Sequence, residues 1–234
     1  MSVAGGAGVP ILGLDTSTPS TVAGVLLPDG RVLEARDDPA PGERPGHQPR
    51  LLSLAAEVLA EAGLGWAEVG RLAVGVGPGG FTGLRIGIAT ARALAQAHGL
   101  VLVPVSSLRA LAAGADAAGR PVAAVTDARR GEVFAGVYDA AGATLLAPAA
   151  LDPAELAGRL ERLPETVLAV GDGAVRFRAQ LEGAGAAVPA DDAPMHRIGA
   201  EQVCRLGAAG EPADRDALLP DYHREPDARP QSSP

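Results

Sequence analysis

The segment that most constrains the fold runs from residue 75 to 97 and reads GVGPGGFTGLRIGIATARALAQA. The apolar residues 72–76 that lead into it are typical of a buried strand, and the GPGG sequence at 77–80 interrupts that strand. Thr82 is then predicted to cap a helix with its hydroxyl group. Such a strand, glycine turn and helix present backbone N–H groups at the positive end of a helix, which predicts an anion or phosphate site. The alternative is that the glycines only allow a sharp turn and close packing of the helix on the sheet.

The same segment excludes two common classes of nucleotide-binding protein. The chain has no lysine, so all 20 of its basic residues are arginine. A Walker-type phosphate loop, which needs a lysine followed by serine or threonine, is therefore excluded, as is Schiff-base chemistry. The glycine spacing also departs from the Gly-x-Gly-x-x-Gly pattern of dinucleotide-binding Rossmann folds.

The helix after the glycine turn is apolar on nearly every side. On a helical wheel its larger apolar residues share one face and its smaller ones a second face, which leaves a narrow polar stripe. The first face contains Leu84, Ile88, Ala91 and Ala95, the second Ile86, Ala89, Ala93 and Ala97, and the stripe Arg85, Arg92 and Gln96. The helix at residues 48–62 is also apolar over more than half of its circumference. Two such helices predict a helix-on-helix contact with a partner chain, unless they cover each other or a second lobe of the same chain.

Composition favours a layered α/β protein that does not hold nucleic acid by itself. The 234 residues are 47% hydrophobic but only 3% aromatic, so the cores must consist mainly of aliphatic side chains. A net charge of −8, without a basic stripe or stacking aromatics, argues against an autonomous RNA-binding protein. The single cysteine, Cys204, excludes an intramolecular disulfide, and the N-terminal residues lack the basic and apolar parts of a signal peptide. We therefore expect a cytoplasmic protein without a membrane span.

One pattern of elements occurs twice along the chain. Three short predicted strands, a helix, a strand and a second helix precede residue 100, and the same order follows residue 121. The sequence thus predicts two βββαβα lobes, one over residues 9–108 and one over 109–223. The ends, residues 1–8 and 224–234, are rich in glycine, proline or serine and are expected to be flexible tails.

Five stretches of the sequence resemble the TsaB family. They are ILGLDTST near the N-terminus, GPGGFTGLRIGIATARALA, DARRGEVFAGVY, VGDGA and LLPDYHREPDA, and the resemblance extends over about residues 10–228. It implies an actin-like ATPase (ASKHA) fold with two RNase H-like lobes. It also implies a non-catalytic subunit of the bacterial machinery that forms threonylcarbamoyladenosine next to the tRNA anticodon, acting by dimerising with and activating the catalytic subunit TsaD. The ATPase TsaE would be a further partner and tRNA an indirect one, and the chain could form a homodimer when alone.

The resemblance assigns the partner interface to the two apolar helices, and no residue is predicted to be catalytic. The predicted interface residues are Leu51, Leu54, Val58, Arg85, Ile86, Ala89 and Ala93. Two alternatives from other classes stay open. One is an active ATPase or kinase-type enzyme that uses Asp15 and the loop at residues 77–83, and the other is a protein that only forms homodimers through the same helices.

Actin-like kinases place an acidic residue and a glycine turn at the end of the first strand, where they face the nucleotide phosphates. The residues that could face a phosphate here are Asp15, Thr16, Thr18, Gly77, Gly79, Thr82 and Gly83. Ser17 stands where the glycine of that turn would lie, which hinders the close approach of a phosphate. Asp15 could instead close a local Asx turn. We therefore expect no cofactor in the isolated chain, with ATP or ADP only at the partner interface.

A metal site is not expected. TsaD-type relatives bind metal through His-x-x-x-His on the first helix, where the i and i+4 spacing puts both imidazoles on one face. Here His47 is followed four residues later by Leu51, and the other histidines, His98, His196 and His223, are isolated in the sequence. We expect His47 to lie beside the start of the helix rather than to bind a metal.

Two charged turns of the second half are weaker candidates. Residues 127–132, DARRGE, join two predicted strands, and their paired arginines could meet tRNA phosphate or partner carboxylates, or could simply be solvated. Asp172, between two glycines, could face a cleft between the lobes or only shape a turn.

Overall fold

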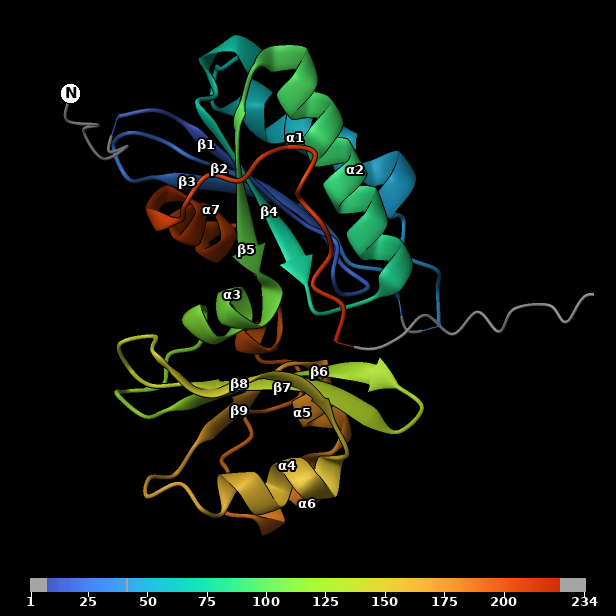
Figure 1. The fold of residues 1–234 in the computed structure, drawn as a ribbon, viewed down its shortest axis with the longest axis vertical. Coiled ribbons are helices and arrows are strands. Elements are labelled where there is room, and N and C mark those ends of the chain that lie inside the picture. Colours follow the sequence, from blue (N-terminus) through green and yellow to red (C-terminus); the bar gives the residue numbers. More distant parts are fainter. Residues whose placement is uncertain (1–7, 41, 224–234) are drawn as a thin grey trace, which may run out of the picture.

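The structure is a computed structural model that describes residues 8–40 and 42–223. Its strands form two sheets, with helices between the sheets and on both outer sides (Figure 1). The predicted flexible tails, apart from Gly8, lie outside the described residues. Within the described part, no helix is long and apolar enough to cross a membrane.

The first sheet has the strand order β3-β2-β1-β4-β5. The three antiparallel strands are β1 (Ile11–Asp15), β2 (Thr21–Leu26) and β3 (Val32–Asp37), and β4 (Arg71–Gly77) and β5 (Val101–Ser106) run parallel to β1. All five residues of β1 are buried, as expected for a central strand covered on both faces. The crossover helices α1 (His47–Glu61) and α2 (Phe81–His98) cover one face, and a short 3-10 helix, η1 (Trp66–Glu68), leads into β4.

The second sheet repeats this order with four strands, β8-β7-β6-β9. Its strands are β6 (Val122–Arg129), β7 (Glu132–Tyr138), β8 (Thr144–Leu151) and β9 (Leu168–Val170). The helices α4 (Pro153–Leu160), α5 (Asp172–Arg176) and α6 (Arg178–Gly183) lie on its outer side, and η2 (Pro194–His196) follows them (Figure 1). Two antiparallel three-strand meanders, each extended by a parallel strand after a helix, confirm the predicted actin-like fold with two RNase H-like lobes.

Two helices are exchanged between the lobes. The helix α3 (Ser107–Ala113) follows the last strand of the first sheet but packs against β6 and β7. The helix α7 (Ala200–Ala209) follows the second sheet but packs against β1, β2 and β4. The two helices also contact each other and share a hydrophobic cluster with both sheets. The predicted boundary at residue 108 divides the chain by sequence order. In the structure α3 and α7 each pack against the sheet of the other lobe, so the two lobes share part of their core.

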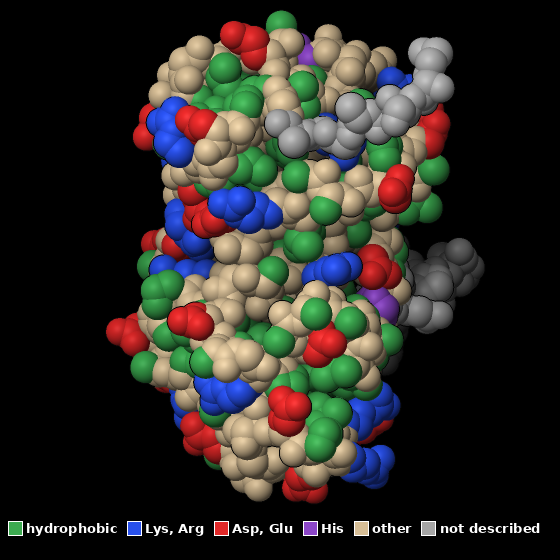
Figure 2. All heavy atoms as spheres, turned by 90° about the vertical axis from the view of Figure 1, so that its left-hand side faces the viewer, with side chains coloured by type: hydrophobic (Ala, Val, Ile, Leu, Met, Phe, Trp, Pro, Cys, Tyr) green, Lys and Arg blue, Asp and Glu red, His purple; other side chains and the backbone are tan. Residues whose placement is uncertain are grey.

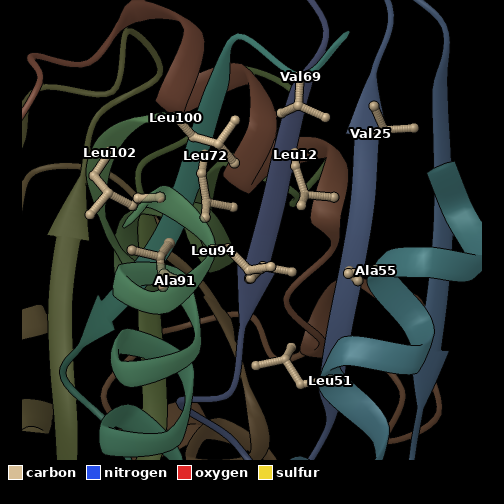
Figure 3. Packing of buried hydrophobic residues seen from close by; sticks show 14 of the residues in the cluster. Leu12, Val25, Leu51, Ala55, Val69, Leu72, Ala91, Leu94, Leu100 and Leu102 are labelled. Carbon is tan, nitrogen blue, oxygen red and sulfur yellow. The ribbon is translucent and has the colours of Figure 1, made fainter. Parts of the chain in front are cut away.

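The main core lies between the first sheet and the helices α1 and α2 (Figure 3). Leucine and valine side chains of the strands meet leucine and alanine side chains of both helices there. Complete burial of one such leucine or valine contributes roughly 1.5–3 kcal/mol. In Figure 3, Leu51 of α1 and Leu94 of α2 lie over the strands that carry Leu12 and Leu72. The apolar faces predicted from the helical wheel are therefore mainly core faces of this chain.

Cys204 should be unreactive in the native protein. Its side chain is 0% exposed on α7, and burial raises the pKa of the thiol to about 12. Because only the thiolate reacts, we expect alkylation by iodoacetamide at pH 8 to be at least about a thousandfold slower than in urea-unfolded protein. Mass spectrometry of timed samples measures both rates. Comparable rates in the two samples would show that α7 leaves the first sheet easily.

Candidate functional site

A cleft of about 750 Å³ lies between the two lobes. The β1–β2 turn, the loop before α1 and the start of α2 form its first-lobe wall. The β6–β7 hairpin and the start of α5 form its second-lobe wall, and residues 221–223 lie at its edge. The carboxyl ends of β1 and β6, equivalent strands of the two lobes, therefore face the same cavity, which is where open α/β sheets generally bind ligands.

The structure brings most of the predicted phosphate-facing residues to this cleft. Thr16, Thr18, Gly79, Thr82 and Gly83 line it. Asp15 and Gly77 do not belong to its lining, because both are buried behind the first-lobe wall. Whether any of these residues meets a phosphate stays a prediction.

Asp15 is engaged inside the first lobe. One carboxylate oxygen, Oδ1, accepts hydrogen bonds from the Ser17 backbone N–H at 2.8 Å and from the Ser17 hydroxyl at 2.7 Å. The other, Oδ2, accepts one from the Ser107 hydroxyl at 2.8 Å. A Cβ at Gly75 would lie only 1.8 Å from Oδ2, so only glycine fits beneath this carboxylate. The arrangement is the local Asx turn that the sequence left open as an alternative.

Replacement of Asp15 by asparagine should stabilise the protein at neutral pH. Burial raises the pKa of Asp15 above its ordinary value, although the hydrogen bonds from Ser17 and Ser107 oppose that effect. The folded state therefore holds a proton that the unfolded chain releases, so the stabilising contribution is complete below about pH 4 and is lost as pH rises through the folded-state pKa. We expect Asp15→Asn to increase the free energy of unfolding at pH 7 and to increase it by less near pH 4. Urea titrations at both pH values measure this, and a gain that is larger at pH 4 would contradict the raised pKa.

The glycine turn packs closely against the β1–β2 turn. The Gly80 N–H donates to the Ser17 carbonyl at 2.7 Å, and a Cβ at Gly79 would come within 2.3 Å of that oxygen. One helical turn later, the Thr16 hydroxyl donates to the Gly83 carbonyl at 2.8 Å. These glycines therefore have at least the packing role that the sequence offered as the alternative to a phosphate cradle.

The predicted cap of α2 is wrong. The helix begins at Phe81, its N-cap is Gly80, and no side chain caps it. Because the Ser17 carbonyl accepts a hydrogen bond from the Gly80 N–H, the chain turns into the helix two residues earlier than expected. Thr82 consequently lies in the first helical turn, exposed to the cleft.

His47 starts α1 and lines the cleft, as expected for a residue at the helix start. Its Nδ1 lies 2.9 Å from the Thr21 hydroxyl, and burial lowers its pKa, with the Asp37 carboxylate opposing. Leu51, one turn further, is 1% exposed in the core. Among residues 8–40 and 42–223, the structure contains no group of three or more His, Cys, Asp or Glu side chains placed to hold a metal ion.

The second-lobe wall carries an acidic pair. Asp172 Oδ1 accepts hydrogen bonds from the backbone N–H groups of Asp127 at 3.0 Å and of Gly173 at 2.9 Å, so it both shapes the turn and lines the cleft. Although water still reaches Asp172, crowding by the cleft walls desolvates it and raises its pKa, and the neighbouring Asp127 adds to that effect. Asp127 also pairs with Arg176 at 2.8 Å and more distantly with Arg129 at 3.5 Å. The hairpin turn needs Gly131, which has φ of 84°.

Sequence reasoning missed the role of residues 211–223, which we call the C-terminal strap. The strap returns along the first lobe beside α2 (Figure 1, red), and Leu218 is 3% exposed in the main core. The Asp221 N–H donates to the Val76 carbonyl at 2.8 Å. Tyr222 stacks on Phe81 with ring centroids 5.3 Å apart, and its hydroxyl accepts from Arg85 Nε at 3.0 Å. Only the LLPDYH sequence hinted at this contact, through its aromatic and apolar residues.

The predicted interface residues fall into two groups. Leu51, Leu54 and Val58 are 0–1% exposed and packed on the first sheet, so their assignment to a partner surface is wrong. Helical periodicity identified an apolar face of α1. It could not show whether this chain's own sheet or a partner chain covers that face. Ala89 and Ala93 are exposed, and Ile86 is half-buried, which leaves the small face of α2 open. Arg85 is exposed but is held over the Phe81 ring, 3.8 Å from its centroid.

Comparison with known proteins identifies relatives over most of the chain. A family model described as "TsaD: tRNA N6-adenosine threonylcarbamoyltransferase" matches residues 44–182. An uncharacterized protein of Mycobacterium bovis is 34% identical, with a match that covers 94% of each chain. The "tRNA threonylcarbamoyladenosine biosynthesis protein TsaB" of Escherichia coli is 37% identical over 55% of this chain and 54% of its own length. The solved structure of "YeaZ from Pseudomonas aeruginosa" has a TM-score of 0.74 at 30% identity and covers 92% of this chain and 99% of YeaZ.

The family model covers more than half of the chain, and the matched residues include α1, the glycine turn and the second-lobe wall of the cleft. The match to YeaZ covers 92% of this chain, so it extends over both lobes. The chain belongs to the TsaB (YeaZ) family.

Proposed function

We propose that this chain is a non-catalytic subunit in the formation of N6-threonylcarbamoyladenosine next to the tRNA anticodon. In this role it pairs with the catalytic subunit TsaD in the cytoplasm and activates it, with TsaE as a further partner. The printed names of its relatives support the pathway, because those relatives are called tRNA threonylcarbamoyladenosine biosynthesis proteins. The proposed pairing with TsaD rests on one observation, an exposed strip of small and apolar side chains on α1 and α2.

This strip joins two neighbouring helices. On α2 it contains Ala89 and Ala93, both exposed, and on α1 it contains Leu52, whose side chain is 51% exposed although it is a leucine. The two helices contact each other, and all three residues are exposed on them. Small side chains let a second helix approach closely, and an exposed leucine beside them adds apolar area to bury. A helix pair of another actin-like protein is the kind of partner that fits.

The cleft supports an accessory role rather than an independent ATPase. Asp15, the carboxylate that the enzyme alternative requires, is fully engaged with Ser17 and Ser107. The glycine turn is packed against Ser17. ATP or ADP would then bind where TsaD completes the site, rather than in the isolated chain.

The experiment is to mix the purified chain with TsaD from the same organism. Light scattering after gel filtration should show a heterodimer, and addition of TsaE, ATP, tRNA and a threonylcarbamoyl donor should give modified tRNA only when both subunits are present. ATP turnover by the chain alone would support the enzyme alternative. Homodimers that persist unchanged with TsaD present would support self-association instead.

The isolated chain should bind tRNA only weakly. Its net charge is −8, and on the face shown in Figure 2 arginine and acidic side chains are interspersed rather than gathered by sign. We expect a dissociation constant in the non-specific range, on the order of 10⁻⁴ to 10⁻⁶ M at physiological salt. Filter binding with labelled tRNA measures it, and submicromolar affinity of the lone subunit would contradict an indirect role towards tRNA.

A further inference from the structure

The helix α2 is basic, although the chain as a whole is acidic. The chain has 28 Asp and Glu residues against 20 arginines, which gives a net charge of −8. The 18 residues of α2 contain neither Asp nor Glu, but they include Arg85 and Arg92. On α1, the exposed residues Leu52, Ala56 and Ala60 follow one another at intervals of four, so they form an uncharged row. A body that covers both helices therefore meets positive charge along α2.

The two arginines lie on either side of the exposed alanine of the strip. Residues three and four positions apart are neighbours on a helix, so Ala89 lies between Arg85 and Arg92. Two helical turns, about 10 Å along the axis, separate the arginines. Arg85 is exposed, and 36% of the Arg92 side chain is exposed. A helix that packs on Ala89 would therefore have both guanidinium groups beside it.

The C-terminal strap holds the two guanidinium groups in place. Arg85 Nε donates to the Tyr222 hydroxyl at 3.0 Å, and the guanidinium group lies 3.8 Å from the centroid of the Phe81 ring. Arg92 Nη2 donates to Asp216 Oδ1 at 3.2 Å. These hydrogen bonds use one of the five N–H donors of each arginine. Tyr222 and Phe81 are neutral and leave the charge of Arg85 uncompensated, whereas Asp216 offsets part of the charge of Arg92.

We propose that this face of α2 selects a partner helix that carries two carboxylate groups about two turns apart. One carboxylate pairs with Arg85 and the other with Arg92, while the partner helix packs on Ala89 and Ala93. Arginine can bind a carboxylate through two parallel hydrogen bonds, and a guanidinium group that is already held in place loses little conformational freedom on pairing. The inference rests on the proposed function, in which this strip docks TsaD, and it adds the charge pattern that the partner carries.

The same two arginines disfavour pairing with a second copy of this chain. In a two-fold symmetric pair of α2 helices that meet at Ala89, Arg85 of each copy would face Arg92 of the other. Like charges that face each other across an interface weaken it and exclude the wrong partner. The small side chains of the strip would accept either a second copy or an acidic partner helix, and the arginines favour the acidic helix.

The first test is the affinity of the full chain for TsaD from the same organism, measured by isothermal titration. At low salt, Arg85→Gln and Arg92→Gln should each weaken binding about twofold to fivefold, the range of single exposed charge pairs. Asp216→Asn removes a carboxylate that competes for Arg92, so it should strengthen binding about twofold. These differences should shrink between about 50 and 300 mM NaCl, because salt screens exposed charges. Arg162→Gln, at an exposed position of the second lobe, is the matched control and should change nothing.

A second test does not need TsaD. The double variant Arg85→Glu/Arg92→Glu carries carboxylates at the proposed spacing, so it should pair with the wild-type chain. Sedimentation equilibrium should show that the mixed pair is at least about tenfold tighter than either chain with itself. Thermal melting shows whether the double variant is folded. If it is not, Arg92→Glu alone replaces it, with an expected preference of about threefold for the mixed pair.

The two tests separate this inference from the proposed function. If TsaD binds the wild type and every variant equally, the charge selection is overturned and the pairing with TsaD stands. If TsaD does not bind the wild type, the proposed function is wrong and the mixed pair decides. A preference for the mixed pair then supports the charge selection. Its absence, whether through equal self-association or through no association at all, overturns it.

Discussion

Gly83→Ala is expected to destabilise the protein by about 3 kcal/mol or more, although alanine is normally the better helix former. A Cβ at this position would lie 2.0 Å from the Thr16 carbonyl oxygen and 3.1 Å from His47 Nε2. The first obstacle is backbone of the β1–β2 turn, so it cannot move without shifting the end of β1. The helix would have to withdraw from the sheet, which also breaks the Thr16–Gly83 hydrogen bond of 2.8 Å.

Gly158→Ala is the matched control. Gly158 lies inside α4, and a Cβ there would meet nothing within 4 Å. This change should stabilise the protein by roughly 0.5–1 kcal/mol, the usual gain from replacing glycine in a helix. Urea unfolding of both variants measures the difference. If Gly83→Ala stays within 1 kcal/mol of the wild type, α2 does not depend on close packing against Thr16.

The positions of the elements could be predicted from the sequence because each carries a local signal. The apolar residues indicate β1 and β4, the helical period indicates α2, and Asp152–Pro153 indicates the start of α4. Only the start of α2 was placed two residues too late. The two faces of α2 were also predictable, since Leu84 and Ile88 are buried while Ala89 and Ala93 are exposed. On α2 the face with the larger apolar side chains is the buried face.

Features that depend on distant segments could not be predicted. The exchange of α3 and α7, the strap beside α2 and the Ser107 hydroxyl on Asp15 all join residues far apart in the chain. The same limit explains the error on α1, where Leu51 and Leu54 are buried under the helix by this chain's own sheet.

Ala93→Glu is expected to abolish pairing with TsaD while leaving the fold intact. Ala93 is exposed on α2, so the free subunit can keep the new carboxylate hydrated. In the proposed complex the same carboxylate would be buried against an apolar helix, which should cost several kcal/mol of binding free energy. Ile88→Glu should act in the opposite way. Ile88 is 4% exposed in the main core, so this charge should cost more than about 4 kcal/mol of folding free energy and unfold the first lobe.

Thermal melting and TsaD affinity, measured in parallel, separate the two faces. Ala179→Glu, an exposed alanine on the second-lobe helix α6, is the control for added charge and should alter neither measurement. Leu52→Glu, on the α1 part of the strip, should reproduce the binding defect of Ala93→Glu with an unchanged melting temperature. If Ala93→Glu lowers the melting temperature and spares binding, the faces of α2 are assigned the wrong way round. If Ala93→Glu and Leu52→Glu both bind TsaD normally, the strip is not the docking surface, and the pairing must use another part of the molecule.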